Sequence, residues 1–94
     1  MPDKRNARKS RAQLARDIEE ARRDLGLTQE GFAEILWNRH TTNRTQAALI
    51  NDVFAWEARG MNPHNAYFIP CCEELGLIAE DYMSSRYSLK KKAE

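Results

Sequence analysis

The sequence predicts an all-α fold, a compact bundle of five helices joined by short connections. Apolar residues recur three or four positions apart along most of the chain, as they do on the buried face of a helix. Ser or Thr precedes several of these segments and Gly follows several of them, which is typical of helix caps. No strand-like alternation and no repeat is visible, and 94 residues are enough for one modest core.

The first two helices are expected at about 11–25 and 29–37. Ser10 and Thr28 stand where helix caps belong, and Gly26 follows the first helix. The apolar residues that mark the first helix are Leu14, Ile18, Ala21 and Leu25. Those that mark the second helix are Phe32, Ala33, Ile35 and Leu36. Both stripes have the spacing of a helix that packs one face on a core.

A third helix is expected at about 46–58, with Thr45 as its cap and Gly60 after its last turn. The polar connection before it, residues 38–45, is expected to be a loop. One face of this helix carries Leu49, Val53 and Trp56. Residues pointing elsewhere are Ile50, Asn51, Phe54 and Ala55. A helix that exposes large apolar residues and few charges is expected to contact a partner.

The last two helices are expected near residues 65–75 and at about 79–87. Pro70 lacks a backbone N–H, so the fourth helix either begins near Ile69 or bends there. A C-terminal apolar patch consists of Tyr82, Met83, Tyr87 and Leu89. This patch either closes the core of the monomer or forms the contact of a homodimer.

The charges divide the chain into three parts: a basic arm at 1–9 expected to be flexible, a domain at 10–88 and a basic tail at 89–94. Residues 1–23 carry a net charge of +4 and residues 84–94 carry +3, whereas residues 24–83 carry −6. Basic arms attract nucleic acid by releasing counterions from phosphates.

The segments LGLTQEGFAEIL (25–36), WEARGMNP (56–63) and IPCCEELGL (69–77) occur in one order along the chain. Together they resemble the Cro/repressor-type, or Xre-like, helix-turn-helix family. The resemblance implies a lambda-repressor-like DNA-binding domain in which the helix at 46–58 lies in the major groove. The connection before that helix is longer here than the family has. Trp56 and Glu57 match residues that pack and orient the reading helix.

By position, Gln29 matches a Gln with which the family contacts DNA, and Asn51 and Phe54 occupy base-facing positions. Asn can bind adenine through two hydrogen bonds, and Phe54 or Ile50 can touch a thymine methyl group. Asp52 could accept a hydrogen bond from cytosine. The residues expected to contact DNA are Lys4, Arg5, Arg8, Gln29, Arg39, Thr41, Thr42, Asn43, Arg44, Thr45, Gln46, Ile50, Asn51 and Phe54.

Each of these assignments has a plainer alternative. The arm at 1–9 can be a solvated tail, and the residues at 38–45 can be an ordinary polar connection. Asn51 can lie on an ordinary solvent-exposed face, and Phe54 can belong to the core or to a dimer contact. For the whole chain, the alternative to DNA binding is a protein-interaction module, such as an antitoxin that docks a partner protein and also binds its own operator.

The favoured function is a sequence-specific, DNA-binding transcriptional regulator, most simply a repressor, whose partner is double-stranded DNA. No catalytic pattern and no phosphate-cradling Gly loop is present, so neither enzyme activity nor a cofactor is expected. His40, His64, Cys71 and Cys72 lack the spacing of a metal site, and the adjacent cysteines suggest a reducing compartment. No apolar run is long enough to span a bilayer, so a cytoplasmic protein is expected.

Overall fold

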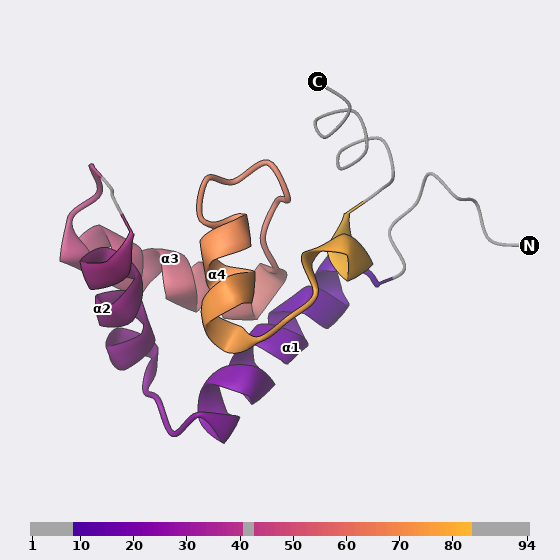
Figure 1. The fold of residues 1–94 in the computed structure, drawn as a ribbon, viewed down its shortest axis with the longest axis horizontal. Helices are drawn as coiled ribbons and strands as arrows, with labels where there is room; N and C mark the ends of the chain where they lie inside the picture. The colour runs from indigo at the N-terminus through magenta and orange to yellow at the C-terminus, as the bar shows by residue number, and fades with distance from the viewer. Residues whose placement is uncertain (1–8, 41–42, 84–94) are drawn as a thin grey trace, which may run out of the picture.

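The structure is a computed structural model, and it describes residues 9–40 and 43–83. These residues form four α-helices and one 3-10 turn, and the described residues include no strand. The elements are α1 (Arg11–Asp24), α2 (Gln29–Arg39), α3 (Gln46–Arg59), α4 (Phe68–Leu75) and η1 (Ala79–Tyr82) (Figure 1). The all-α prediction is therefore confirmed.

The expected fifth helix at about 79–87 is replaced, over its described part, by the 3-10 turn η1. No side-chain cap is formed at Ile78, and Met83 already has an extended backbone. A helix needs several turns before its hydrogen bonds offset the cost of nucleation, and residues 79–82 complete only one. Residues 84–87, and with them Tyr87 of the expected apolar patch, lie outside the described residues.

All three predicted helix caps are confirmed. The Ser10 hydroxyl accepts a hydrogen bond from the Gln13 N–H at 3.0 Å. Thr28 accepts in the same way from Gly31 at 2.9 Å, and Thr45 accepts from Ala48 at 3.1 Å. Each cap satisfies one of the N–H groups that the first turn of a helix leaves without a partner. These caps fix where α1, α2 and α3 begin.

The end of α2 differs from the prediction by two residues, whereas the start of α4 agrees with the expected start near Ile69. α2 runs on to Arg39, so only residues 40–45 connect it to α3. α4 begins at Phe68, which places Pro70 in the first turn, where its missing N–H leaves no hydrogen bond unmade.

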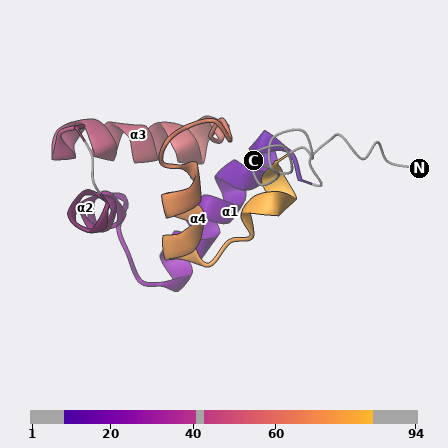
Figure 2. The same ribbon diagram turned by 45° about the horizontal axis from the view of Figure 1, so that its top comes forward.

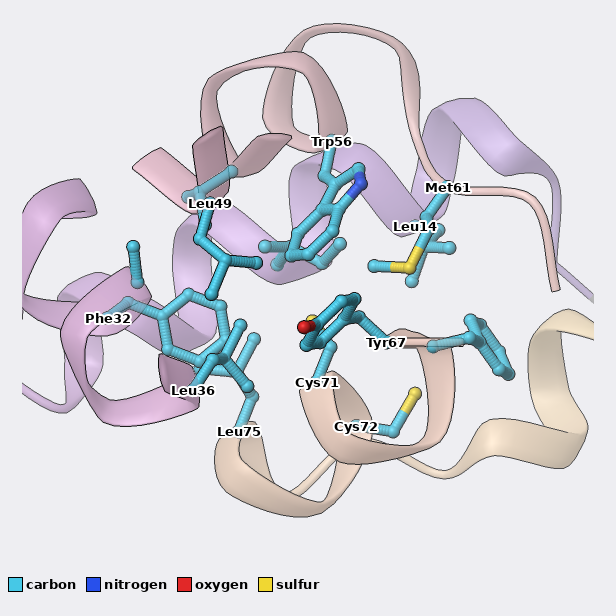
Figure 3. Packing of buried hydrophobic residues seen from close by; sticks show 14 of the residues in the cluster. Leu14, Phe32, Leu36, Leu49, Trp56, Met61, Tyr67, Cys71, Cys72 and Leu75 are labelled. Atoms are coloured by element: carbon cyan, nitrogen blue, oxygen red, sulfur yellow. The ribbon is translucent and has the colours of Figure 1, made fainter. Parts of the chain in front are cut away.

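One apolar core joins all five elements (Figure 3). Its members are Leu14, Ile18, Phe32, Ala33, Leu36, Leu49, Val53, Trp56, Met61, Tyr67, Phe68, Cys71, Cys72, Leu75 and Tyr82. The rings of Trp56 and Tyr67 lie 6.2 Å apart between centroids. Both cysteines are free and buried, and burial raises the pKa of Cys72 to about 11 and that of Cys71 further. They pack as small apolar side chains.

α3 lies across one end of the bundle and packs on both α1 and α2. Figure 2 shows α2 end-on while α3 runs across the view, so these two helices cross rather than run side by side. α4 lies beneath the second half of α3 (Figure 2). This arrangement leaves the side of α3 that faces away from α1, α2 and α4 exposed to solvent.

The start and end of the described chain are joined at one corner. The Lys9 N–H donates to the Asp81 carbonyl at 2.8 Å, and the Tyr82 hydroxyl donates to Asp17 at 2.6 Å. Lys9 also lies over the Tyr82 ring, with its ammonium 5.6 Å from the ring centroid. Tyr82 of the expected C-terminal patch therefore closes the core of the monomer. No helix in the described part of the chain is both long and apolar enough to cross a membrane.

Candidate nucleic-acid interface

The outward face of α3 is a stripe of uncharged side chains. Its exposed members are Ala47, Asn51, Phe54 and Ala58, which follow one another at helical spacing. The opposite face carries the buried residues Leu49, Val53 and Trp56. Phe54 is 42% exposed, so it does not belong to the core of the monomer. We call these four exposed residues the α3 outward face.

A buried ion pair fixes α3 to α1. Arg22 donates from Nε to Glu57 Oε2 at 2.6 Å and from Nη2 to Oε1 at 3.1 Å, and its Nη1 donates to the Leu27 carbonyl at 2.7 Å. The Arg22 and Glu57 side chains are only 9% and 6% exposed. The hydrogen bonds to Glu57 raise the pKa of Arg22 despite its burial. Because both charges are paired and bonded, the orientation of α3 is well defined.

Arg22 is not among the residues that the sequence pattern singles out. A signal is nevertheless present, because Arg22 follows Leu14 and Ile18 at four-residue spacing and so continues the apolar stripe of α1. An Arg on a buried stripe indicates a carboxylate partner.

Gln29 also bonds to Glu57, the partner of Arg22. Its side-chain amide donates to Glu57 Oε1 at 3.0 Å, and the residue is half-buried. The structure therefore places Gln29 between α2 and α3 and away from the α3 outward face. Glu57 receives hydrogen bonds from both preceding helices, and these bonds fix the orientation of α3.

Arg39 and His40 end α2 at a contact with α4. Arg39 Nη1 donates to Glu74 Oε1 at 2.9 Å, and His40 Nε2 lies 3.0 Å from Glu74 Oε2. Glu74 therefore holds the end of α2 against α4 by both of its oxygens. The phosphate contact expected of Arg39 would compete with this interaction.

Arg44 pairs with Asp52 on the first half of α3. Its Nε donates to Asp52 Oδ2 at 3.0 Å and its Nη2 donates to Oδ1 at 2.8 Å. Both side chains are partly exposed, at 45% and 26%. Asp52 is thus occupied by Arg44, so the cytosine contact considered for it would require this pair to open.

The other expected site residues fall into three groups. Asn43 and Thr45 are exposed just before α3, with the Thr45 hydroxyl engaged as the helix cap. Gln46 and Ile50 are half-buried beside the α3 outward face, and Ile50 packs against the core. Those that lie outside the described residues are Lys4, Arg5, Arg8, Thr41 and Thr42.

The α3 outward face presents one amide, one aromatic ring and two small side chains on an anchored helix. Among the described residues, no three His, Cys, Asp or Glu side chains are placed to hold a metal ion together. Comparison with protein-family models, with curated proteins and with solved structures found no match to this chain.

Proposed function

We propose that this chain binds double-stranded DNA with α3 in the major groove and acts as a transcriptional regulator, most simply as a repressor that occupies its site. The observation that carries the proposal is the α3 outward face, an uncharged stripe on a helix that crosses α2 and is anchored to α1 by Arg22 and Glu57. The order of the segments that resemble the Cro/repressor-type family points in the same direction.

The dimensions of α3 suit the groove. A helix of 14 residues is roughly 21 Å long, and the major groove is about 12 Å wide and admits one helix. Ala47 and Ala58 lie at the two ends of the α3 outward face, and their small side chains allow the helix to approach the bases. The two longer side chains between them, Asn51 and Phe54, then reach furthest towards the base edges.

Asn51 and Phe54 both favour A·T base pairs. An Asn side chain binds adenine through its N6 and N7 atoms, and an aromatic ring contacts the thymine methyl group. Asp52 is occupied by Arg44, and the α3 outward face carries no Arg or Lys that would bind guanine. We therefore expect an A·T preference where α3 contacts the bases.

The proposal is tested by titrating a labelled random-sequence duplex with the protein over a series of salt concentrations. We expect the logarithm of the affinity to fall linearly with the logarithm of the salt concentration, because bound phosphates release counterions. The matched variants are Asn51→Ala and Asn38→Ala, since Asn38 is an exposed asparagine on α2. On a duplex containing the preferred site, only Asn51→Ala should weaken binding. Affinity that does not respond to salt would contradict the proposal.

A second candidate function is the docking of a partner protein, such as a toxin held by an antitoxin. Two observations favour it. Phe54 is 42% exposed on a face with no charged residue, and the two arginines that most closely precede α3, Arg39 and Arg44, are paired with carboxylates. An exposed aromatic residue surrounded by small side chains suits a protein interface.

Phe54→Ala separates the two candidates. Ile69→Ala is a matched control, because Ile69 is an apolar residue on α4 that is 45% exposed. Protein docking predicts that a complex recovered with the wild type is lost in Phe54→Ala and kept in Ile69→Ala, while DNA affinity is unchanged. DNA binding predicts that Phe54→Ala weakens binding to the preferred duplex.

A further inference from the structure

A hollow of about 460 Å³ lies beside the first half of α3. It is bordered by the residues before α3, by α3 itself and by the α3–α4 connection. Its lining consists of Asn43, Arg44, Asp52, Asn65, Ala66 and Tyr67. The Arg44–Asp52 pair spans the hollow from the loop to the helix. Arg44 is thus a cation beside the first half of α3, the helix proposed to enter the major groove.

The Tyr67 hydroxyl is a buried polar group without a hydrogen-bond partner among the residues that the structure describes. The residue is 9% exposed, and the Asn65 side chain holds its backbone by accepting the Tyr67 N–H at 2.8 Å. In Figure 3 the hydroxyl end of the ring points away from Met61 and towards the side on which Leu49 lies. Leaving such a hydroxyl without a partner is costly, so a buried example calls for an explanation.

Asp52 is a candidate acceptor for the Tyr67 hydroxyl. Tyr67 and Asp52 line the same hollow. Burial is the main cause that raises the pKa of Tyr67, and the negative charge of Asp52 also raises it while that of Arg44 lowers it. The phenol therefore lies within the field of both members of the pair. Each Asp52 oxygen accepts one hydrogen bond from Arg44, and in this arrangement neither accepts one from the Tyr67 hydroxyl.

We propose that Arg44 is an exchangeable phosphate contact: a backbone phosphate of DNA draws Arg44 away from Asp52, and Asp52 then accepts a hydrogen bond from the Tyr67 hydroxyl. This inference rests on the proposed DNA binding. The exchange depends on Arg44 in the loop before α3, on Asp52 in α3 and on Tyr67 in the α3–α4 connection.

The exchange is physically reasonable for two reasons. The Arg44–Asp52 pair is partly exposed, and ion pairs in such positions hold weakly because water screens them. A phosphate accepts two parallel hydrogen bonds from a guanidinium as a carboxylate does, so Arg44 loses little by changing partner. Asp52, left beside an anionic duplex, gains a donor in Tyr67 and remains hydrogen-bonded.

The test measures DNA affinity and its salt dependence for the full chain and for variants, with a random-sequence duplex as the probe. Arg44→Ala should weaken binding and reduce the salt slope by about 0.9, the contribution of one phosphate. Arg23→Ala is the matched control, because Arg23 forms an exposed pair with Glu19 on α1 and the charge change is the same. The control should leave the slope unchanged.

Tyr67→Phe separates exchange from simple structural support. It removes the hydroxyl that has no partner in the free protein, so the urea midpoint of unfolding should stay the same or rise. DNA affinity should nevertheless fall several-fold, because Asp52 then has no donor once Arg44 has moved. Asp52→Ala should raise DNA affinity, and in that background Tyr67→Phe should have no further effect on binding.

Three results would overturn the exchange: an unchanged salt slope in Arg44→Ala, a Tyr67→Phe variant whose DNA affinity equals that of the wild type, or the same Tyr67→Phe effect with and without Asp52. If the wild type binds no duplex at low salt, the proposed DNA binding itself fails. If the wild type binds DNA and the Arg44→Ala and Tyr67→Phe variants bind as the wild type does, the exchange is wrong but the proposed DNA binding stands.

Discussion

At the scale of single residues, Arg22 and Glu57 are the pair on which the position of α3 depends. Both side chains are nearly fully buried. When one member of the pair is removed, water therefore cannot take its place beside the remaining charge. Removing one member therefore leaves a buried charge without compensation, which is far more costly than the pair itself is stabilising.

We predict that Glu57→Ala lowers the free energy of unfolding by about 3–5 kcal/mol, measured by urea denaturation. Glu19→Ala is the control, since Glu19 forms a pair with Arg23 on α1 in which the side chains are 40% and 69% exposed. That substitution should cost less than about 1 kcal/mol. Equal losses in the two variants would show that Glu57 is not a buried anchor.

A second residue-scale prediction concerns Asp17 and acid. Burial alone would raise the pKa of Asp17, but hydrogen bonds from Tyr82 and Gln13 and the charges of Lys9 and Arg16 together hold it below the usual value. The carboxylate therefore stabilises the fold above its unfolded-state pKa of about 3.9, and this stabilisation is lost as the pH falls through the lower folded-state pKa.

We accordingly expect Tyr82→Phe to cost about 1.5–3 kcal/mol at neutral pH, the range for a hydrogen bond to a charged group. Urea denaturation at neutral pH and again below the folded-state pKa of Asp17 measures the change. The difference from the wild type should shrink in acid, when Asp17 is neutral in both proteins. A difference that is independent of pH would mean that Asp17 does not use this bond as a charged acceptor.

At the scale of helices, the end of α3 depends on one glycine. Gly60 has a φ of +85°, and a Cβ at this position would meet the Arg11 carbonyl oxygen at the start of α1. Gly26 has a similar φ of +75°, but a Cβ there would have no neighbour within 4 Å. Both positions have a positive φ, which strains a residue that carries a Cβ. At Gly60 the ψ of 179° also lies outside the left-handed helical region, and of the two only Gly60 lacks space for a Cβ.

Gly26→Ala is therefore expected to cost about 1 kcal/mol for the backbone conformation alone. Gly60→Ala should cost clearly more, because α1 and α3 must also move apart. Thermal and urea unfolding of both variants measures the difference. If the two substitutions proved equally tolerated, the close contact between the end of α3 and the start of α1 would be incorrect.

Helix positions were predictable because their signals are local. Ser10, Thr28 and Thr45 stand one residue before helices that the apolar spacing also indicates, and Pro70 restricts where α4 can begin. The extra residues of α2 and the 3-10 form of η1 could not be predicted, since no cap residue marks either boundary.

The candidate site was predictable only in part, because only some of its features depend on local signals within one helix. The outward direction of Asn51 and Phe54 follows from the spacing of Leu49, Val53 and Trp56 within one helix. Partners far apart in the sequence are not visible in such a pattern.

Ion pairs illustrate this. Arg22–Glu57 and Arg39–Glu74 each join residues 35 positions apart, and Arg44–Asp52 joins residues eight positions apart across the start of α3. Arg39 and Arg44, which the sequence suggests as phosphate contacts, are each paired with a carboxylate in the folded chain. Arg22, which the sequence analysis does not single out, holds α3 to α1.

At the scale of the whole molecule, the charge distribution sets what the basic arm should do. Residues 24–83 carry a net charge of −6, so phosphate attraction must come mainly from other parts of the chain. Replacing Lys4, Arg5 and Arg8 together with Ala should therefore weaken binding to all duplexes by a similar factor. Affinity for a preferred and a random duplex measures this, and a change in the ratio between them would contradict a role limited to phosphates.

The most direct test of the central claim is the selection of bound sequences from a random duplex pool by the wild type and by Asn51→Ala in parallel. We predict that the wild type enriches one motif and that the variant loses its preference at one A·T pair, a loss of about 1–3 kcal/mol in discrimination. Failure of the wild type to enrich any motif at moderate salt, or an identical motif from both proteins, would contradict a recognition role for the α3 outward face in DNA binding.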